Sequence, residues 1–168
     1  GLPSGIPPGV SRGAESGGFS ESGLKDVTLE AWCKVLAELP LCFQPGTAWE
    51  YSVGIDVIGR VIEVITGETL AAVMQREIFD PLGMVDTGFD VPTNKLARFA
   101  DCYEKREDDP LALFDSAQDS RFAEGRVSLY AGGGGLVSTL DDYMRFGEMI
   151  RLGGALEGVR RLSPRTVR

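Results

Sequence analysis

The chain carries the sequence Pro45-Gly46-Thr47-Ala48-Trp49-Glu50-Tyr51-Ser52-Val53 directly before an amphipathic segment. The Pro-Gly pair is typical of a turn. Trp49 and Tyr51 lie two positions apart, so an extended backbone points both side chains to the same side. Ser52 is predicted to cap a helix over residues 53–66, whose apolar positions recur at helical spacing: Val57, Ile58, Val61, Ile62 and Ile65. The pattern places a phenol at a helix N-terminus, where it either packs in a core or moves protons.

Composition narrows the classes of function. The 168 residues suit one domain, and 43% apolar with 25% charged residues is ordinary for a globular protein. The net charge of −8 and the lack of a basic stripe argue against nucleic-acid binding, which needs clustered Lys and Arg. No run approaches the roughly 18 apolar residues of a membrane span. We therefore expect a small-molecule substrate, no nucleic acid and no membrane span.

The chain contains no histidine, which removes Ser-His-Asp and Cys-His catalysis and His-based metal sites. Its three cysteines, Cys33, Cys42 and Cys102, are widely separated and form neither a zinc pattern nor a disulfide framework. They are expected to be buried small hydrophobic residues. Three unpaired thiols favour the cytoplasm over the periplasm. No cofactor and no metal are expected.

Hydrophobic periodicity predicts an α+β chain that is mostly helical. Residues 1–27, rich in Gly, Ser and Pro, are predicted to form a loop-rich arm, and residues 28–168 the helical part. Three helices with clear start or stop signals are predicted in the first half: from the Thr28 cap to Pro40, over 53–66 up to Gly67, and over 70–79 up to Pro81.

The second half of the chain has weaker signals. Two short apolar runs, 96–103 and 111–114, predict a β-hairpin. Thr139 and Asp142 form a predicted capping box for a last long helix, which ends at Gly153-Gly154. Ser163-Pro164 is typical of one more helix start, close to the final residue. Both ends of the chain are therefore expected to be internal to a longer protein.

Three local features can carry chemistry, and each also has a purely structural interpretation. A tyrosine phenol titrates near pH 10, so Tyr51 can act as a base only with a cation nearby in addition to the helix dipole. Ser22 and Lys25 match Ser-x-x-Lys, in which the lysine takes the serine proton without a histidine, but so short a pattern is common by chance. The glycine run, residues 132–135, either borders a substrate cleft or allows a close backbone approach.

The order of the motifs closely resembles the serine β-lactamase-like family, which covers class C β-lactamases, D,D-peptidases and family VIII-type serine esterases. The stretch around Tyr51 is followed by Asp56-Val57-Ile58-Gly59-Arg60-Val61-Ile62-Glu63. The other matching stretches are Ile78-Phe79-x-Pro81-Leu82-Gly83-Met84-x-Asp86-Thr87, Gly133-Gly134-Gly135-Leu136-Val137-Ser138-Thr139-x-x-Asp142-Tyr143-x-Arg145-Phe146 and Leu162-Ser163-Pro164-x-Thr166-Val167. The likeness covers about residues 28–168, and the ordered set is far more specific than any single stretch.

The resemblance implies the helical domain of the β-lactamase/transpeptidase-like fold with a short β-hairpin, most of the antiparallel sheet being missing. It implies acyl transfer through a covalent serine ester, with Tyr51 as general base or proton relay. The implied substrate-binding residues are Trp49, Ser52, Val53, Gly133 and Gly134. Val53 stands where this family's Tyr-x-Asn element has its Asn, which favours carboxylester over β-lactam hydrolysis.

Two family elements have no counterpart in the chain. The Ser-x-x-Lys pair is expected well upstream of the Tyr, and a Lys-Thr-Gly-like or His-x-Gly-like strand beyond residue 168. We therefore expect the chain alone to be inactive and its exposed apolar faces to promote association. Three alternatives stay open: a non-catalytic binding module on the same scaffold, a β-lactamase or D,D-peptidase, and a self-sufficient Ser22–Lys25 pair.

Overall fold

The computed structural model describes residues 27–41, 43–49 and 51–168. They fall into two compact units. Unit 1 comprises the described residues up to Leu70 together with Ser128–Gly135, and unit 2 comprises Ala71–Val127 and Leu136–Arg168. Among these residues helices predominate, and the strands form two short antiparallel pairs. The predicted α+β, mostly helical class is confirmed. The predicted arm, Ser22, Lys25 and Cys42 lie outside the described residues.

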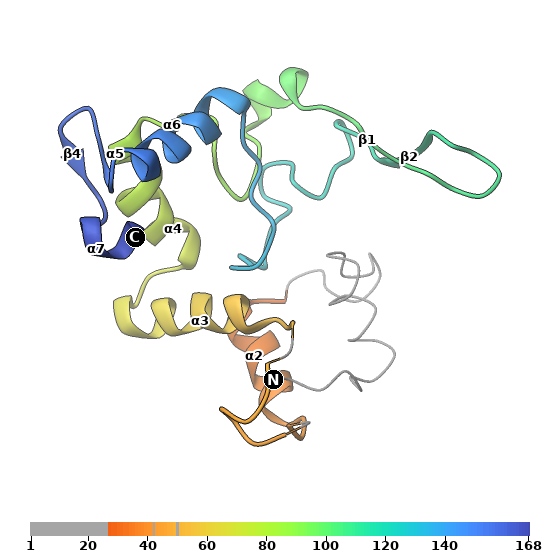
Figure 1. Ribbon diagram of the computed structural model, residues 1–168. Helices are drawn as coiled ribbons and strands as arrows, with labels where there is room; N and C mark the ends of the chain where they lie inside the picture. The colour runs from red at the N-terminus through yellow and green to blue at the C-terminus, as the bar shows by residue number, and fades with distance from the viewer. Residues whose placement is uncertain (1–26, 42, 50) are drawn as a thin grey trace. The chain divides into compact units, whose positions relative to one another are not determined.

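In the described part of unit 1, two helices pack against each other, α2 (Leu29–Ala37) and α3 (Gly54–Thr66) (Figure 1). Thr28 caps α2 as predicted, because its hydroxyl accepts the Ala31 N–H at 3.2 Å. The buried side chains of α2 recur on one face: Leu29, Trp32 and Leu36. The sequence pattern therefore identified the buried face of this helix correctly.

Helix α3 meets α2 through Gly59, the one buried residue of α3. A methyl group at Gly59 would come within 2.9 Å of Leu70 Cδ2 and 3.2 Å of Leu29 Cδ2, so only glycine allows this approach. The apolar face of α3 is exposed instead of packed, as its large side chains show: Ile55, Val57, Ile58, Val61, Val64 and Ile65. Gly67 ends the helix in the left-handed conformation at φ 72°, as predicted.

The start of α3 differs from the prediction by one residue. Val53, not Ser52, occupies the N-cap position, and no side chain caps the helix. The helix begins at Gly54 because the Val53 carbonyl accepts the N–H groups of Asp56 and Val57, at 3.0 and 3.3 Å. Ser52 therefore lies one position before the cap, and its predicted capping role is wrong.

Unit 2 begins within the helix predicted over 70–79. This helix continues through Pro81 and comprises α4 (Leu70–Met74), a π-helical turn (Gln75–Phe79) and α5 (Asp80–Leu82). The prediction that Pro81 ends it is wrong. Proline removes a helical N–H and crowds the carbonyl four residues earlier. The π-helical turn precedes that point, and the Asp80 N–H bonds to the Gln75 carbonyl five residues back. The helix ends one turn later at Gly83, with φ 66°.

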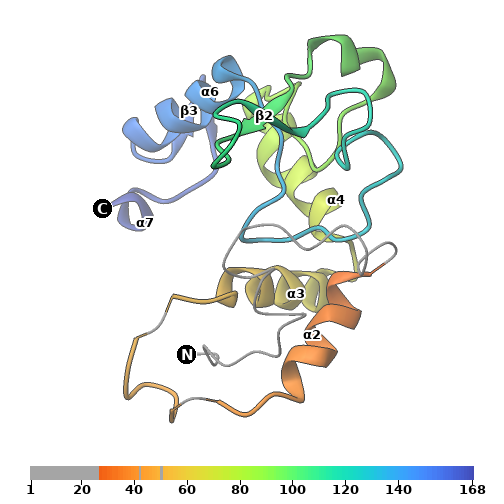
Figure 2. The same cartoon turned by 90° about the vertical axis from the view of Figure 1, so that its right-hand side faces the viewer.

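The core of unit 2 lies between this helix and α6 (Leu140–Arg151), which lie side by side in Figures 1 and 2. Its buried members are Phe79, Leu82, Met84 and Met149. Thr139 caps α6 by accepting the Asp142 N–H at 3.3 Å. This half of the predicted capping box is confirmed, whereas the Asp142 carboxylate bonds elsewhere, as shown below. The unit ends with a short β-hairpin and a helix. The hairpin pairs β3 (Ala155–Leu156) with β4 (Val159–Arg160), and Ser163 caps the helix α7 (Pro164–Val167).

The predicted hairpin is present as β1 (Cys102–Glu104) paired with β2 (Ala112–Asp115), and it projects from unit 2 in Figure 1. Its first strand is shorter than predicted, because residues Thr93–Arg98 form a 3-10 helix. The Thr93 N–H and hydroxyl both bond to Glu124 Oε2 at 2.9 Å, which anchors that turn. Cys102 is exposed on β1, so its predicted burial is wrong, while Cys33 is half-buried.

Candidate active site

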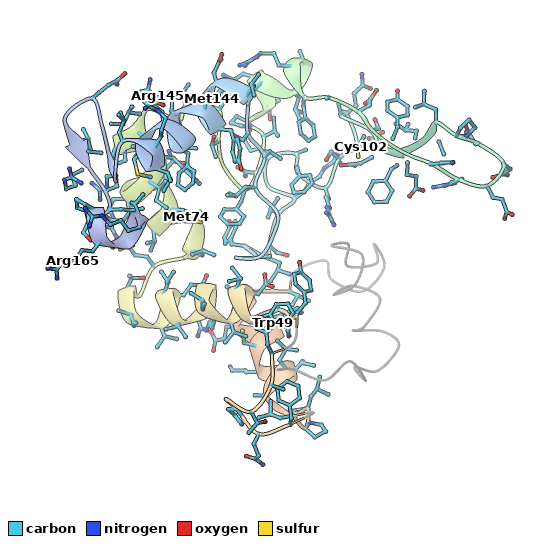
Figure 3. The ribbon with its side chains drawn as sticks, in the orientation of Figure 1. Trp49, Met74, Cys102, Met144, Arg145 and Arg165 are labelled. Carbon is cyan, nitrogen blue, oxygen red and sulfur yellow. The ribbon has the colours of Figure 1, made fainter. Side chains whose placement is uncertain are left out.

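The segment between α2 and α3 carries the predicted catalytic tyrosine. The Pro45-Gly46 turn is closed by the Thr47 N–H bonding to the Gln44 carbonyl at 3.1 Å, with Gly46 at φ 85°. After the turn, Trp49 is 84% exposed and Tyr51 is 85% exposed. Trp49 lies beside the N-terminal end of α3 (Figure 3). Within the described part of the chain, Tyr51 is therefore not a core residue, and its hydroxyl is open to a reacting partner.

Ser52 and Val53 follow as half-buried residues leading into α3. The Val53 carbonyl is fixed by the two N–H groups of the first turn of α3. Free N–H groups at a helix start give a partial positive charge, which favours negative charge nearby. The phenol thus sits just before a helix N-terminus, as the sequence predicts, although Ser52 does not cap that helix.

The glycine run lies against the same helix end. The Gly133 N–H donates to Asp56 Oδ1 at 3.0 Å, and Asp56 is the third residue of α3. A methyl group at Gly132 would lie 2.5 Å from the Ile55 carbonyl oxygen, so the two backbones are in direct contact. Gly134 has no atom within 4 Å of the position that a methyl group would take. The structure thus brings Gly132 and Gly133 to the helix that follows Tyr51, and leaves Gly134 free of such contacts.

Asp56 is the residue of this region that sequence reasoning did not single out. It appears there only as one letter of a matching stretch. Its signal is a carboxylate in the first turn of a helix, which commonly compensates the unpaired N–H groups of that turn. Only the fold shows that it reaches a backbone N–H 77 positions further along the chain.

A second polar cluster lies in unit 2 and includes a buried carboxylate. Asp142, 4% exposed, accepts the Asp86 N–H at 2.6 Å and the Thr87 hydroxyl at 2.9 Å. The Thr87 and Ser138 hydroxyl oxygens are 2.8 Å apart, and Gly88 and Val137 form a two-bond backbone bridge. These contacts join residues 86–88 to the segment before α6.

The cluster borders a pocket of about 310 Å³, in which Asp86 is paired with two cations. Lys95 Nζ and Arg98 Nη2 each lie 2.9 Å from a carboxylate oxygen of Asp86. The Arg98 hydrogen bond, and after it the Lys95 hydrogen bond, hold the pKa of Asp86 below its usual range. Lys95 and Arg98 thus neutralise the Asp86 carboxylate. We interpret this cluster as a structural connection between loops rather than a reacting centre.

The described residues were searched for the serine–lysine pair that the predicted mechanism requires. Neither serine–lysine hydrogen bonds nor groups of three or more potential metal ligands occur among them. Ser138 contacts a hydroxyl and a backbone carbonyl, neither of which activates it as a lysine amine would. In the same part of the chain, no helix combines the length and apolar character that crossing a bilayer requires.

Comparison with known protein families identifies the family of this chain. The family described as Beta-lactamase matches residues 1–168, and the chain belongs to that family. The chain is 39% identical over 139 residues to Protein Rv1367c from Mycobacterium tuberculosis, covering 83% of the chain and 34% of that protein. It is 36% identical over 141 residues to Esterase EstB from Burkholderia gladioli, covering 76% of the chain and 36% of the esterase. The chain therefore spans about a third of the length of these relatives.

The fold agrees with this assignment. The solved structure of EstCE1, described as a hydrolase with promiscuous acyltransferase activity, matches with a TM-score of 0.70 and 28% identity. The match covers 86% of this chain and 40% of that one. The resemblance inferred from the ordered motifs is thus confirmed at the level of family and fold, as part of the β-lactamase-like α+β architecture.

Proposed function

We propose that this chain is part of a serine hydrolase of carboxylesterase type, in which Tyr51 is the general base or proton relay of an acyl-enzyme mechanism. The observation that carries the proposal is the exposed Tyr51 phenol at the entry to α3. The 36% identity to Esterase EstB supports an ester as substrate. Val53, in place of an amide side chain, supports an ester over a β-lactam or peptide.

The proposed reaction has two steps, acylation of the serine and hydrolysis of the acyl-enzyme. The serine oxygen bonds to the acyl carbon, the ester C–O bond breaks, and the serine proton passes to the leaving alcohol through Tyr51. Water then attacks the acyl-enzyme, gives its proton back through the phenol, and releases the acid and the free serine. The nucleophilic serine and its lysine are expected outside this chain, so the chain alone is expected to be inactive.

Tyr51→Phe tests the proposal in the complete protein. The substitution removes only the hydroxyl, so kcat for a p-nitrophenyl ester is expected to fall by roughly 100-fold or more while the fold is retained. Tyr143→Phe is the matched control, because Tyr143 is also exposed, at 68%, but lies on α6. Equal activity of the two variants would contradict the role of Tyr51.

Fluorophosphonate labelling locates the nucleophile and separates the alternatives. Labelling of the complete protein at a serine outside this chain supports the proposal, whereas labelling of the 168-residue chain at Ser22 supports a self-sufficient Ser22–Lys25 pair. A complete protein that binds an ester but is never labelled and turns nothing over would be a binding module on this scaffold. Faster turnover of penicillin or a D,D-peptide than of esters would instead indicate a β-lactamase or D,D-peptidase.

A further inference from the structure

Asp56 joins the glycine run to the first turn of α3 in unit 1. Two neighbouring residues of the run meet two neighbouring residues of the helix. Gly132 lies against the Ile55 carbonyl, where a methyl group would be 2.5 Å from the oxygen, and the Gly133 N–H bonds to Asp56 Oδ1 at 3.0 Å. The contact is therefore specific in both shape and hydrogen bonding.

This contact changes how the glycines can act. The Gly133 N–H is occupied by Asp56, so Gly133 contributes the position of its backbone rather than a free donor to a substrate. On the helix side, the Asp56 N–H bonds to the Val53 carbonyl at 3.0 Å, two residues after Tyr51. A continuous set of hydrogen bonds thus links the glycine run, Asp56 and the segment that carries the phenol.

We propose that Asp56 is a positioning residue for the ester hydrolysis proposed above. Its carboxylate holds the glycine run at the helix turn that follows Tyr51, so that the phenol and the glycine backbone border the same acyl group. Asp56 touches no reacting atom itself. The inference rests on the proposed function, and it assigns a role that depends on the place of the Asp56 oxygen rather than on its charge.

Three substitutions at Asp56, made in the complete protein, separate the effect of the position of the acceptor oxygen from the effect of the carboxylate charge. Asp56→Asn keeps an acceptor oxygen at the same position without the charge. Asp56→Glu keeps the charge and moves the acceptor by about 1.5 Å, one C–C bond. Asp56→Ala removes both. Asp141→Ala is the matched control, because Asp141 is also a first-turn carboxylate, exposed on α6 and outside the candidate site.

Two readouts are measured on each protein: kcat and KM for p-nitrophenyl butyrate, with kcat referred to fluorophosphonate-titrated sites, and hydrogen exchange of the Gly133 amide. Since a displacement of about 1 Å can cost roughly 100-fold in rate, Asp56→Ala and Asp56→Glu are expected to lower kcat by about 10- to 100-fold with little change in KM. Asp56→Asn is expected to stay within about threefold of the wild type and Asp141→Ala within about twofold, the usual scale of a remote surface change. Exchange at Gly133 should accelerate only in the Ala and Glu variants.

The outcomes distinguish this inference from the proposed function. An active wild type with unchanged kcat in Asp56→Ala, or full activity of Asp56→Glu with loss in Asp56→Asn, overturns the positioning role alone. Unchanged Gly133 exchange in Asp56→Ala also overturns it, because the hydrogen bond would then not hold the run. A wild-type protein that turns over no ester overturns the proposed function and this inference with it. If Asp56→Ala fails to fold, the Glu and Asn variants decide the question.

Discussion

Asp56 in unit 1 and Asp142 in unit 2 make the same type of contact but differ in burial. Each is the third residue of its helix, and each accepts a backbone N–H from a distant loop, of Gly133 and of Asp86 respectively. Asp142 is buried and binds the Thr87 hydroxyl as well, whereas Asp56 is half-exposed with that single distant partner among the described residues. The same first-turn carboxylate is therefore expected to stabilise the fold where it is buried and to position a site where it is open.

The largest expected effect is the loss of stability in Asp142→Ala. The change removes the carboxylate that accepts the half-buried Asp86 N–H and the buried Thr87 hydroxyl, so the free energy of unfolding is expected to fall by about 3 kcal/mol. Chemical unfolding followed by circular dichroism measures it. Asp141→Ala, the neighbouring exposed carboxylate, is the control and should change stability by less than about 0.5 kcal/mol.

Asp56→Ala in the same experiment tests the contrast directly. Its single, half-exposed hydrogen bond is expected to contribute about 1 kcal/mol, the usual net value for such a bond. Equal losses in Asp56→Ala and Asp142→Ala would show that burial does not separate the two carboxylates, and the comparison would break down.

An effect of intermediate size is expected from the glycine backbone itself. Gly132→Ala forces a methyl group to within 2.5 Å of the Ile55 carbonyl oxygen, and a backbone atom gives way less easily than a side chain. We expect a loss of about 2 kcal/mol in stability, typical of overpacking. Gly134→Ala, where nothing lies within 4 Å, is the stability control and should stay within about 0.5 kcal/mol. Equal losses at both positions would mean that the glycine run does not contact α3.

The sequence predicted local structure well and the ties between distant segments poorly. Thr28, Gly67 and Ser163 mark helix ends correctly because capping depends on neighbours within one turn. The contacts of Asp56 and Asp142 span 77 and 56 positions, and no local pattern encodes them. Pro81 misled the prediction because the sequence pattern does not reveal the π-helical turn that directly precedes it.

In the candidate site, too, the sequence predicted local features but not the packing around them. Tyr51 was found from its position before a helix, yet its 85% exposure could not be derived from an alternating Trp-x-Tyr pattern, which suits a core equally well. The apolar stripe of α3 predicted a helix correctly, but not that Gly59 alone would be buried. Periodicity identifies a face, whereas the partner of that face is set by the rest of the fold.

The smallest effect expected is a change in the pH dependence of stability around Asp86, whose backbone N–H is bound by Asp142. The Arg98 and Lys95 hydrogen bonds lower the pKa of Asp86 in the folded protein. A carboxyl group with a lowered folded pKa stabilises the fold above its unfolded pKa of about 3.9, and that contribution is lost as the pH falls through the lower folded value. Arg98→Gln should reduce the part of the acid-induced loss of stability that begins below about pH 4, when unfolding is measured from pH 6 to pH 2.5.

Lys105→Gln removes a positive charge from the exposed hairpin turn and is the charge-matched control, which should keep the wild-type profile. If Arg98→Gln and Lys105→Gln give the same profile, the Arg98–Asp86 ion pair does not contribute to the pH dependence of stability.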